Sequence, residues 1–281
     1  MIYWFKTPQK YWLNKNNISP KEIFIHHPDE EYVSNLQKSQ LITKIIQQVE
    51  IDNHNIIDDL NELNINDQLA ENGIIMPKNS IFTKEKEIKD LLSSLSASLS
   101  QHNKINKIYV KLNANKEEYL IADDTVIELI NAKLSLSRLT EAWIKLLFIS
   151  SLKRNIKRTK VIFRTENNYK SQIIQSPGAT ESNLILEEYI NIFKNYSEKC
   201  LPLPPESAYK YVEAKIKSKN EKKAFTDKWI GNKNFSKGER DNIEMKMCFG
   251  NEKEPDFFLG NNNFDQLSYR LYGPLIKALK K

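Results

Sequence analysis

Apolar residues recur every three or four positions through most of the first hundred residues, which is the spacing of helices with one buried face. This spacing predicts helices over Leu36–Val49, Ile56–Glu71 and Lys84–Leu99. Residues Ile74–Ser80 contain a proline and are expected to connect the second of these helices to the third. The N-terminal part of the chain is therefore predicted to be helical.

The middle of the chain changes to short runs rich in β-branched and aromatic residues, separated by polar breaks that suit hairpins. Three such runs, Lys107–Leu112, Glu118–Ala122 and Thr125–Ile130, predict a β-meander. A helix is expected to follow, with the Ser135 hydroxyl as its N-cap. A fourth strand over Lys160–Arg164 is predicted after that helix.

Helical spacing returns in the last hundred residues. It predicts a helix from Thr180 and further helices over Ala208–Ile216, Lys219–Ile230, Lys237–Met247 and Asn263–Lys280. Three prolines within Leu201–Pro205 require an extended segment between the first two of these helices. We therefore expect an α/β fold, a small mixed sheet flanked by helices, in a single domain over residues 1–281 with a helical part at 1–100 and the sheet plus helices at 103–281.

The composition excludes several classes of protein. Of the 281 residues, 40% are hydrophobic and 10% are aromatic, which is incompatible with an intrinsically disordered chain. No apolar run approaches the roughly 20 residues of a membrane span, and the N-terminus lacks the order of a signal peptide, so we expect a cytoplasmic protein without membrane contact. The seven glycines never adopt a phosphate-binding spacing, so we do not expect nucleotide hydrolysis.

The cysteines and histidines are too few and too scattered to form a recognisable site. Cys200 and Cys248 do not form a C-x-x-C pair, and no H-x-x-x-H pair occurs. The nucleophile motif G-x-S-x-G is absent, and the adjacent His26 and His27 are interpreted as part of a polar loop. We therefore expect two reduced thiols, no metal site and no catalytic triad.

Charge is distributed unevenly along the chain, whose net charge is +6. Acids dominate between Glu50 and Glu71, whereas Ala142–Thr165 contains cations and no acid. The candidate DNA-binding residues are Lys153, Arg154, Lys157, Arg158, Lys160 and Arg164. The first four have helical spacing and are predicted to gather on one side of a helix end, where they could neutralise phosphates of any sequence. The alternative is a solvated helix end, where the helix dipole favours cations.

Tryptophans offer a second possible contact with nucleic acid. Trp4, Trp143 and Trp229 could stack on unpaired bases. Trp143 lies within an apolar helical stripe and Trp229 ends a predicted helix, so we expect all three side chains to belong to the core.

Five segments, spread over the chain in the same order, resemble the C-terminal part of the gamma subunit of exodeoxyribonuclease V, the RecC family. They are Trp4–Leu13, Ala70–Lys78, Leu184–Tyr211 with its sequence Leu-Pro-Leu-Pro-Pro-Glu-Ser-Ala-Tyr, the pieces between Lys223 and Asp241, and Phe264–Leu279 with Tyr-Gly-Pro-Leu. Members of that family are far longer, so the chain resembles their C-terminal domain only.

The resemblance implies a fold related to the PD-(D/E)xK nucleases that has lost its catalytic acids. It also implies a place in a helicase–nuclease that processes double-strand breaks during recombinational DNA repair. The implied partners are the beta and alpha subunits of that complex, double-stranded DNA ends and unwound single strands. ATP and Mg²⁺ are expected only in the partner subunits. The chain itself is then a non-catalytic DNA-binding or structural module that needs no cofactor.

The distribution of acids agrees with a lost nuclease site. An active nuclease of that superfamily places two acids and a lysine on adjacent strands around one Mg²⁺. The four Glu-x-Lys triplets, Glu87–Lys89, Glu213–Lys215, Glu221–Lys223 and Glu244–Lys246, all lie in predicted helices. The acids near the meander are interpreted as turn formers.

Two alternatives remain open at this point. One is an active Mg²⁺-dependent nuclease with a rearranged site that uses Glu117, Asp123, Asp124 or Glu128. The other is a pure adaptor between subunits whose basic residues do not contact DNA.

Overall fold

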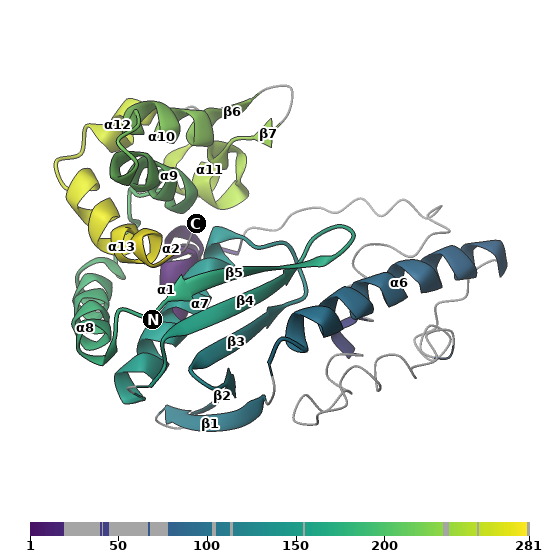
Figure 1. Ribbon diagram of the computed structural model, residues 1–281. Helices are drawn as coiled ribbons and strands as arrows, with labels where there is room; N and C mark the ends of the chain where they lie inside the picture. Colours follow the sequence, from purple (N-terminus) through teal and green to yellow (C-terminus); the bar gives the residue numbers. More distant parts are fainter. Residues whose placement is uncertain are drawn as a thin grey trace. The chain divides into compact units, whose positions relative to one another are not determined.

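The computed structural model describes residues 1–19, 40, 42–44, 67, 78–102, 105–112, 115–153, 155–232, 236–251 and 253–279. The chain divides into two compact units, each built from segments that are not adjacent in the sequence. The helical unit comprises Met1–Phe24, Ser135–Arg154 and Ile174–Lys281, and the sheet unit comprises Ile25–Leu134 and Asn155–Ile173 (Figure 1). The division does not follow the expected boundary near residue 100, and the single-domain organisation stays a prediction.

The sheet unit is organised around a five-stranded mixed sheet in the order β1-β2-β3-β4-β5. The strands are β1 (Asn106–Leu112), β2 (Asn115–Ala122), β3 (Thr125–Ile130), β4 (Arg158–Arg164) and β5 (Tyr169–Gln175), whose last two residues belong to the helical unit. β1, β2 and β3 pair antiparallel, and β3 and β4 pair parallel, which confirms the predicted meander and the mixed sheet. The pattern does not predict β5 because most of its residues are polar. The architecture agrees with the expected α/β class, and the relation to PD-(D/E)xK nucleases stays a prediction.

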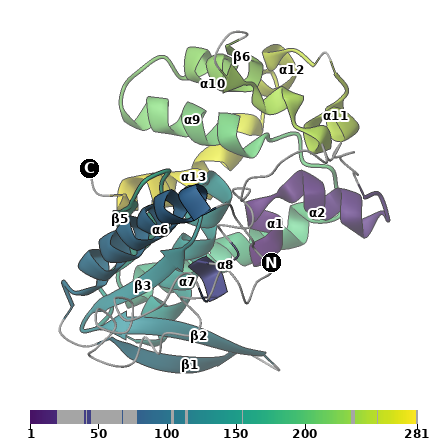
Figure 2. The same ribbon diagram turned by 90° about the vertical axis from the view of Figure 1, so that its right-hand side faces the viewer.

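One long helix, α6 (Lys78–Leu99), lies across one face of this sheet (Figure 2). Apolar side chains of the helix and of that sheet face form one buried core, which includes Ile88, Leu91, Leu92, Leu95, Leu99, Ile127 and Ile162. The predicted helix over Lys84–Leu99 is therefore confirmed. The connector predicted over Ile74–Ser80 is wrong for its last three residues, because α6 begins at Lys78. A proline directly before a helix is compatible with such a helix start.

Several predictions for the N-terminal hundred residues lie outside the described part of the chain. The helices predicted over Leu36–Val49 and Ile56–Glu71 lie outside the described residues, except at positions 40, 42–44 and 67. His26 and His27 also lie outside the described residues. Within the described residues, no helix combines the length and the apolar character that crossing a membrane requires.

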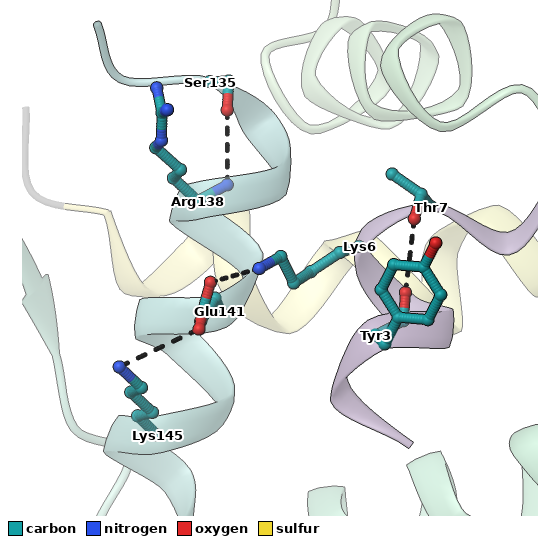
Figure 3. Close-up of polar contacts among 7 residues, drawn as sticks. All are labelled: Tyr3, Lys6, Thr7, Ser135, Arg138, Glu141 and Lys145. Carbon is teal, nitrogen blue, oxygen red and sulfur yellow. Dashed lines mark hydrogen bonds and ion pairs between the residues drawn. The ribbon is translucent and has the colours of Figure 1, made fainter. Parts of the chain in front are cut away.

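The helical unit begins with two short helices, and the first of them forms an ion pair with a longer helix. The elements are α1 (Ile2–Lys6), α2 (Pro8–Lys15), α7 (Leu136–Leu152) and α8 (Ala179–Tyr196). The Ser135 hydroxyl accepts a hydrogen bond from the Arg138 backbone N–H at 3.4 Å, which confirms the predicted N-cap of α7. Lys6 on α1 pairs with Glu141 on α7, and Glu141 Oε1 also lies 3.9 Å from Lys145 Nζ (Figure 3).

A buried hydrogen-bond chain crosses the core of the helical unit. Trp143 Nε1 donates to the Tyr189 hydroxyl at 3.1 Å, and that hydroxyl donates to the Leu271 carbonyl at 2.7 Å. Trp143 is 1% exposed, and Trp4 and Trp229 are fully buried. The core prediction for the three tryptophans is therefore confirmed, and their use as stacking platforms for bases is excluded.

The remaining elements of the helical unit are α9 (Pro205–Ile216), α10 (Glu221–Ile230), β6 (Gly231–Asn232), β7 (Ser236–Lys237), η1 (Glu239–Asp241), α11 (Ile243–Phe249), α12 (Pro255–Leu259) and α13 (Phe264–Ala278). The helix predicted over Lys237–Met247 is wrong in its first half, where the chain forms β7 and the short 3-10 helix η1. Gly238 is required there, because a Cβ atom at this position would lie 2.3 Å from the Trp229 carbonyl oxygen.

A buried carboxylate from η1 caps the start of α9. Pro204 occupies the N-cap position and has no side-chain acceptor for the free N–H groups of the helix. Glu239, which is 3% exposed, supplies the acceptors: Oε1 accepts from Glu206 N at 2.9 Å, and Oε2 accepts from the Ser207 N–H and hydroxyl at 2.6 Å each. Burial raises the pKa of Glu239 to about 7, although these hydrogen bonds favour the ionised form.

Candidate nucleic-acid interface

The predicted DNA-binding cations do not share a helix end. Helix α7 ends at Leu152, and the backbone of Lys153 is already extended, with φ −119° and ψ 106°. Arg154 lies outside the described residues, whereas Lys157 follows in the connector and Arg158 begins β4. The helical arrangement predicted for Lys153, Lys157 and Arg158 is therefore wrong, because the helix ends at Leu152, before these residues.

Lys157 and Arg158 instead lie beside the turn between β2 and β3. Lys157 Nζ is 3.1 Å from Asp124 Oδ2, and Arg158 Nη2 is 3.9 Å from Asp124 Oδ1. The Lys157 backbone N–H donates to the Asp124 carbonyl at 2.8 Å, and Arg158 Nε donates to the Thr125 hydroxyl at 2.9 Å. The hydrogen bond from Lys157 is the main cause that lowers the pKa of the Asp124 carboxyl. These contacts fix the start of β4 to the turn.

Lys160 points into the sheet unit rather than toward solvent. It is 6% exposed, and its ammonium donates to the Ser98 carbonyl at 2.9 Å and to Gln101 Oε1 at 2.6 Å. A cation that binds carbonyls in the last turn of a helix is favoured by the helix dipole, so Lys160 stabilises the end of α6. Burial lowers the pKa of Lys160, and the charge of Arg158 lowers it further. Its contribution to DNA binding stays a prediction.

Among the described residues of this stretch, Lys153, Lys157 and Arg158 are exposed cations, and the side chains of Lys157 and Arg158 are 75% and 46% exposed. We call Lys157, Arg158 and Lys160 the β4 cation cluster. Arg164 ends the same strand and is half-buried. The two turn acids, Asp123 and Asp124, offset part of the positive charge, so the cluster offers a modest net attraction for an anion rather than a strongly basic surface.

The comparison with known families decides what kind of domain this is. The family model described as the RecC C-terminal domain matches residues 1–216, which is most of the chain. The chain belongs to this family. None of the curated proteins matches the chain. The matched range includes all five strands of the sheet and α7 to α9, so the family relationship covers the β4 cation cluster of this RecC C-terminal domain.

One acid of a possible nuclease site, Asp124, is engaged in other contacts in this RecC C-terminal domain. Asp124 interacts with Lys157 and Arg158 and accepts a hydrogen bond from the Thr125 hydroxyl at 3.0 Å. Asp123 is exposed at the turn with φ 52°, in agreement with the turn-former interpretation. The side chain of Glu117 lies outside the described residues. Within the described part of the chain, no three His, Cys, Asp or Glu side chains gather closely enough to hold a metal ion.

The Glu-x-Lys triplets lie in helices α6, α9, α10 and α11, as predicted. In α9 the two charged groups have different partners. Glu213 binds Lys210 at 2.7 Å and Lys217 at 2.6 Å, whereas the Lys215 Nζ lies 2.5 Å from Asp265 Oδ1. Residues two positions apart on a helix point in different directions, so this triplet cannot bring its acid and its lysine to one metal.

Proposed function

We propose that this chain is a non-catalytic DNA-binding and structural module of exodeoxyribonuclease V, the helicase–nuclease that acts in recombinational repair of double-strand breaks. The observation that carries the proposal is the family match over residues 1–216. Its partners in this proposal are the beta and alpha subunits, double-stranded DNA ends and unwound single strands, in the cytoplasm. ATP and Mg²⁺ would act only in the partner subunits.

The β4 cation cluster supports a contact with the DNA backbone. Lys157 and Arg158 are exposed, and their partner Asp124 is itself partly exposed. Exposed ion pairs contribute little to stability, so a phosphate can replace the carboxylate as the partner of these cations at small cost. Such a contact is independent of sequence, which suits a module that meets DNA ends of any sequence. In this proposal the buried Lys160 holds β4 in position through its hydrogen bonds to Ser98 and Gln101.

The side-chain partners support the non-catalytic part of the proposal. The Asp124 carboxylate is neutralised by two cations, and the α9 triplet sends its glutamate and lysine to separate partners. A nuclease site would require such groups to converge on one metal ion. Incubation of the purified chain with linear duplex and single-stranded DNA in the presence of Mg²⁺ or Mn²⁺ tests this point. Cleavage that disappears in Asp124→Ala would contradict it.

Salt-dependent DNA binding tests the DNA contact. The double variant Lys157→Ala/Arg158→Ala should reduce the slope of log K against log salt by about 1.8 for duplex DNA, because each phosphate that a cation neutralises contributes about 0.9 to this slope. The matched control is Lys210→Ala/Lys217→Ala, which removes the same charge from two ion-paired lysines of α9. This control should leave the slope close to that of the parent chain. Equal slopes for both double variants would favour the adaptor role instead.

A further inference from the structure

The two cysteines of the chain, which the sequence separates, come together in the helical unit. Cys200 lies between α8 and α9, and Cys248 lies in α11. Both are free thiols and both are half-buried. The Cys248 thiol lies within interaction distance of the Cys200 sulfur.

Helix α2 holds the two cysteine-bearing segments in place. Gln9 Nε2 donates to the Leu201 carbonyl at 2.9 Å and to the Leu203 carbonyl at 3.1 Å, which fixes the chain directly after Cys200. The next residue of α2, Lys10, places its Nζ 3.9 Å from Glu244 Oε1, one turn before Cys248 in α11. Both segments therefore contact neighbouring residues of α2, the first through two buried hydrogen bonds and the second through an ion pair.

The surroundings give the two thiols different chemical roles. Cys200 lines a cavity of about 140 Å³ together with Tyr196, Lys199 and Asn261, so a small reagent can approach it. The interaction between the two thiols lowers the pKa of Cys200 and raises that of Cys248, and the nearby Glu244 carboxylate also raises the pKa of Cys248. Since a reagent disulfide must reach the attacking sulfur, Cys200, which lines the cavity, is suited to attack first and Cys248 to follow.

We propose that Cys200 and Cys248 are a reversible disulfide site that exchanges with low-molecular-weight disulfides. The Cys200 thiolate attacks one sulfur of the reagent disulfide, a mixed disulfide forms, and the first reagent thiolate leaves. Cys248 then gives up its proton and attacks Cys200 Sγ, and the second reagent thiolate leaves. The cysteine pair is oxidised, the reagent is reduced to two thiols, and these take up the two protons that the cysteines lose.

The bond would tie the segment between α8 and α9 to α11 and close a loop that contains α9, α10 and η1. A cross-link of this kind restricts the unfolded chain more than the folded one, because the native packing already holds the two ends together. The oxidised helical unit should therefore unfold at a higher temperature than the reduced unit.

The test uses the full chain, incubated with oxidised glutathione and analysed by intact mass and by peptide mapping under non-reducing conditions. We expect a monomer lighter by two hydrogen atoms, a Cys200–Cys248 cross-linked peptide, and full reversal by reduced glutathione. Cys248→Ser should accumulate a glutathione adduct at Cys200, and Cys200→Ser should react several times more slowly. A parent chain that carries two glutathione adducts, forms only intermolecular dimers or does not react would overturn the proposal, as would equal rates for the two variants.

Thermal unfolding supplies a second measurement. The oxidised chain should show a midpoint several degrees above that of the reduced chain, and the Cys200→Ser/Cys248→Ser variant should show no difference between the two conditions. A midpoint that is unchanged or lower after oxidation would show that native packing does not accommodate the bond and would also overturn the proposal.

Discussion

The stability of the helical unit should decrease as the pH rises from about 4.5 to about 7, because of Glu239. The pKa of this buried carboxyl is raised from 4.5 to about 7. Between these values the folded chain binds a proton that the unfolded chain has released, so the contribution is fully present below pH 4.5 and is lost as the pH rises through 7. Each pKa unit corresponds to about 1.4 kcal/mol, so the free energy of unfolding should fall by about 3 kcal/mol across this range.

Glu239→Gln isolates this effect, because glutamine has nearly the same size and does not titrate. Urea unfolding followed by tryptophan fluorescence is a suitable assay, since all four tryptophans belong to the helical unit, as Glu239 does. The free energy of unfolding of the parent chain should fall by about 3 kcal/mol relative to that of Glu239→Gln between about pH 4.5 and about pH 8.

The control for this experiment is Glu198→Gln, which removes an exposed carboxylate paired with Lys15. This variant should keep the pH dependence of the parent chain. If Glu239→Gln and the parent chain show parallel pH profiles, the reasoning is refuted: the three hydrogen bonds from α9 would then compensate the cost of burying the charge.

Three substitutions test other parts of the structure. Tyr189→Phe should lower the free energy of unfolding by about 1–3 kcal/mol in urea titrations, because buried Trp143 Nε1 loses its acceptor; an unchanged midpoint would contradict the hydrogen-bond chain. Lys160→Met should lower the unfolding free energy by a similar amount and leave the salt slope of duplex binding unchanged, since its ammonium donates inside the protein; a reduced slope would show a phosphate contact. Gly238→Ala should lower the melting temperature strongly, because its Cβ would meet the Trp229 carbonyl oxygen at 2.3 Å; a melting temperature equal to that of the parent chain would refute this close approach.

Local patterns predicted most of the secondary structure that the described residues show. The strand Thr125–Ile130 and the N-cap Ser135 depend on residues that are close in the sequence, so spacing and residue type suffice to predict them. The burial of Trp143 follows from its place in an apolar helical stripe in the same way. The ordered segments that resemble the RecC family are also a property of the sequence, and the family match confirms this relationship over residues 1–216.

In two segments the secondary structure follows from tertiary contacts rather than from the local sequence pattern. The strand β5 is largely polar, and it is a strand because it completes the sheet beside β4. Lys157 and Arg158 have helical spacing with Lys153, but α7 ends before them and β4 pairs in parallel with β3, which brings both residues to the turn at Asp124.

The chemistry of individual side chains depended on the tertiary structure most of all. Lys160 was indistinguishable from its neighbours as a candidate phosphate ligand, yet α6 buries it. Glu239 caps α9, and Cys200 contacts Cys248, only after distant segments have packed together. The sequence by itself determined the helical and strand periodicities, the core-forming residues and the family, because each of these features depends on residues that are close together in the chain. Only the tertiary structure decided which charges and thiols meet, because burial and pairing between distant segments leave no periodic signal in the chain.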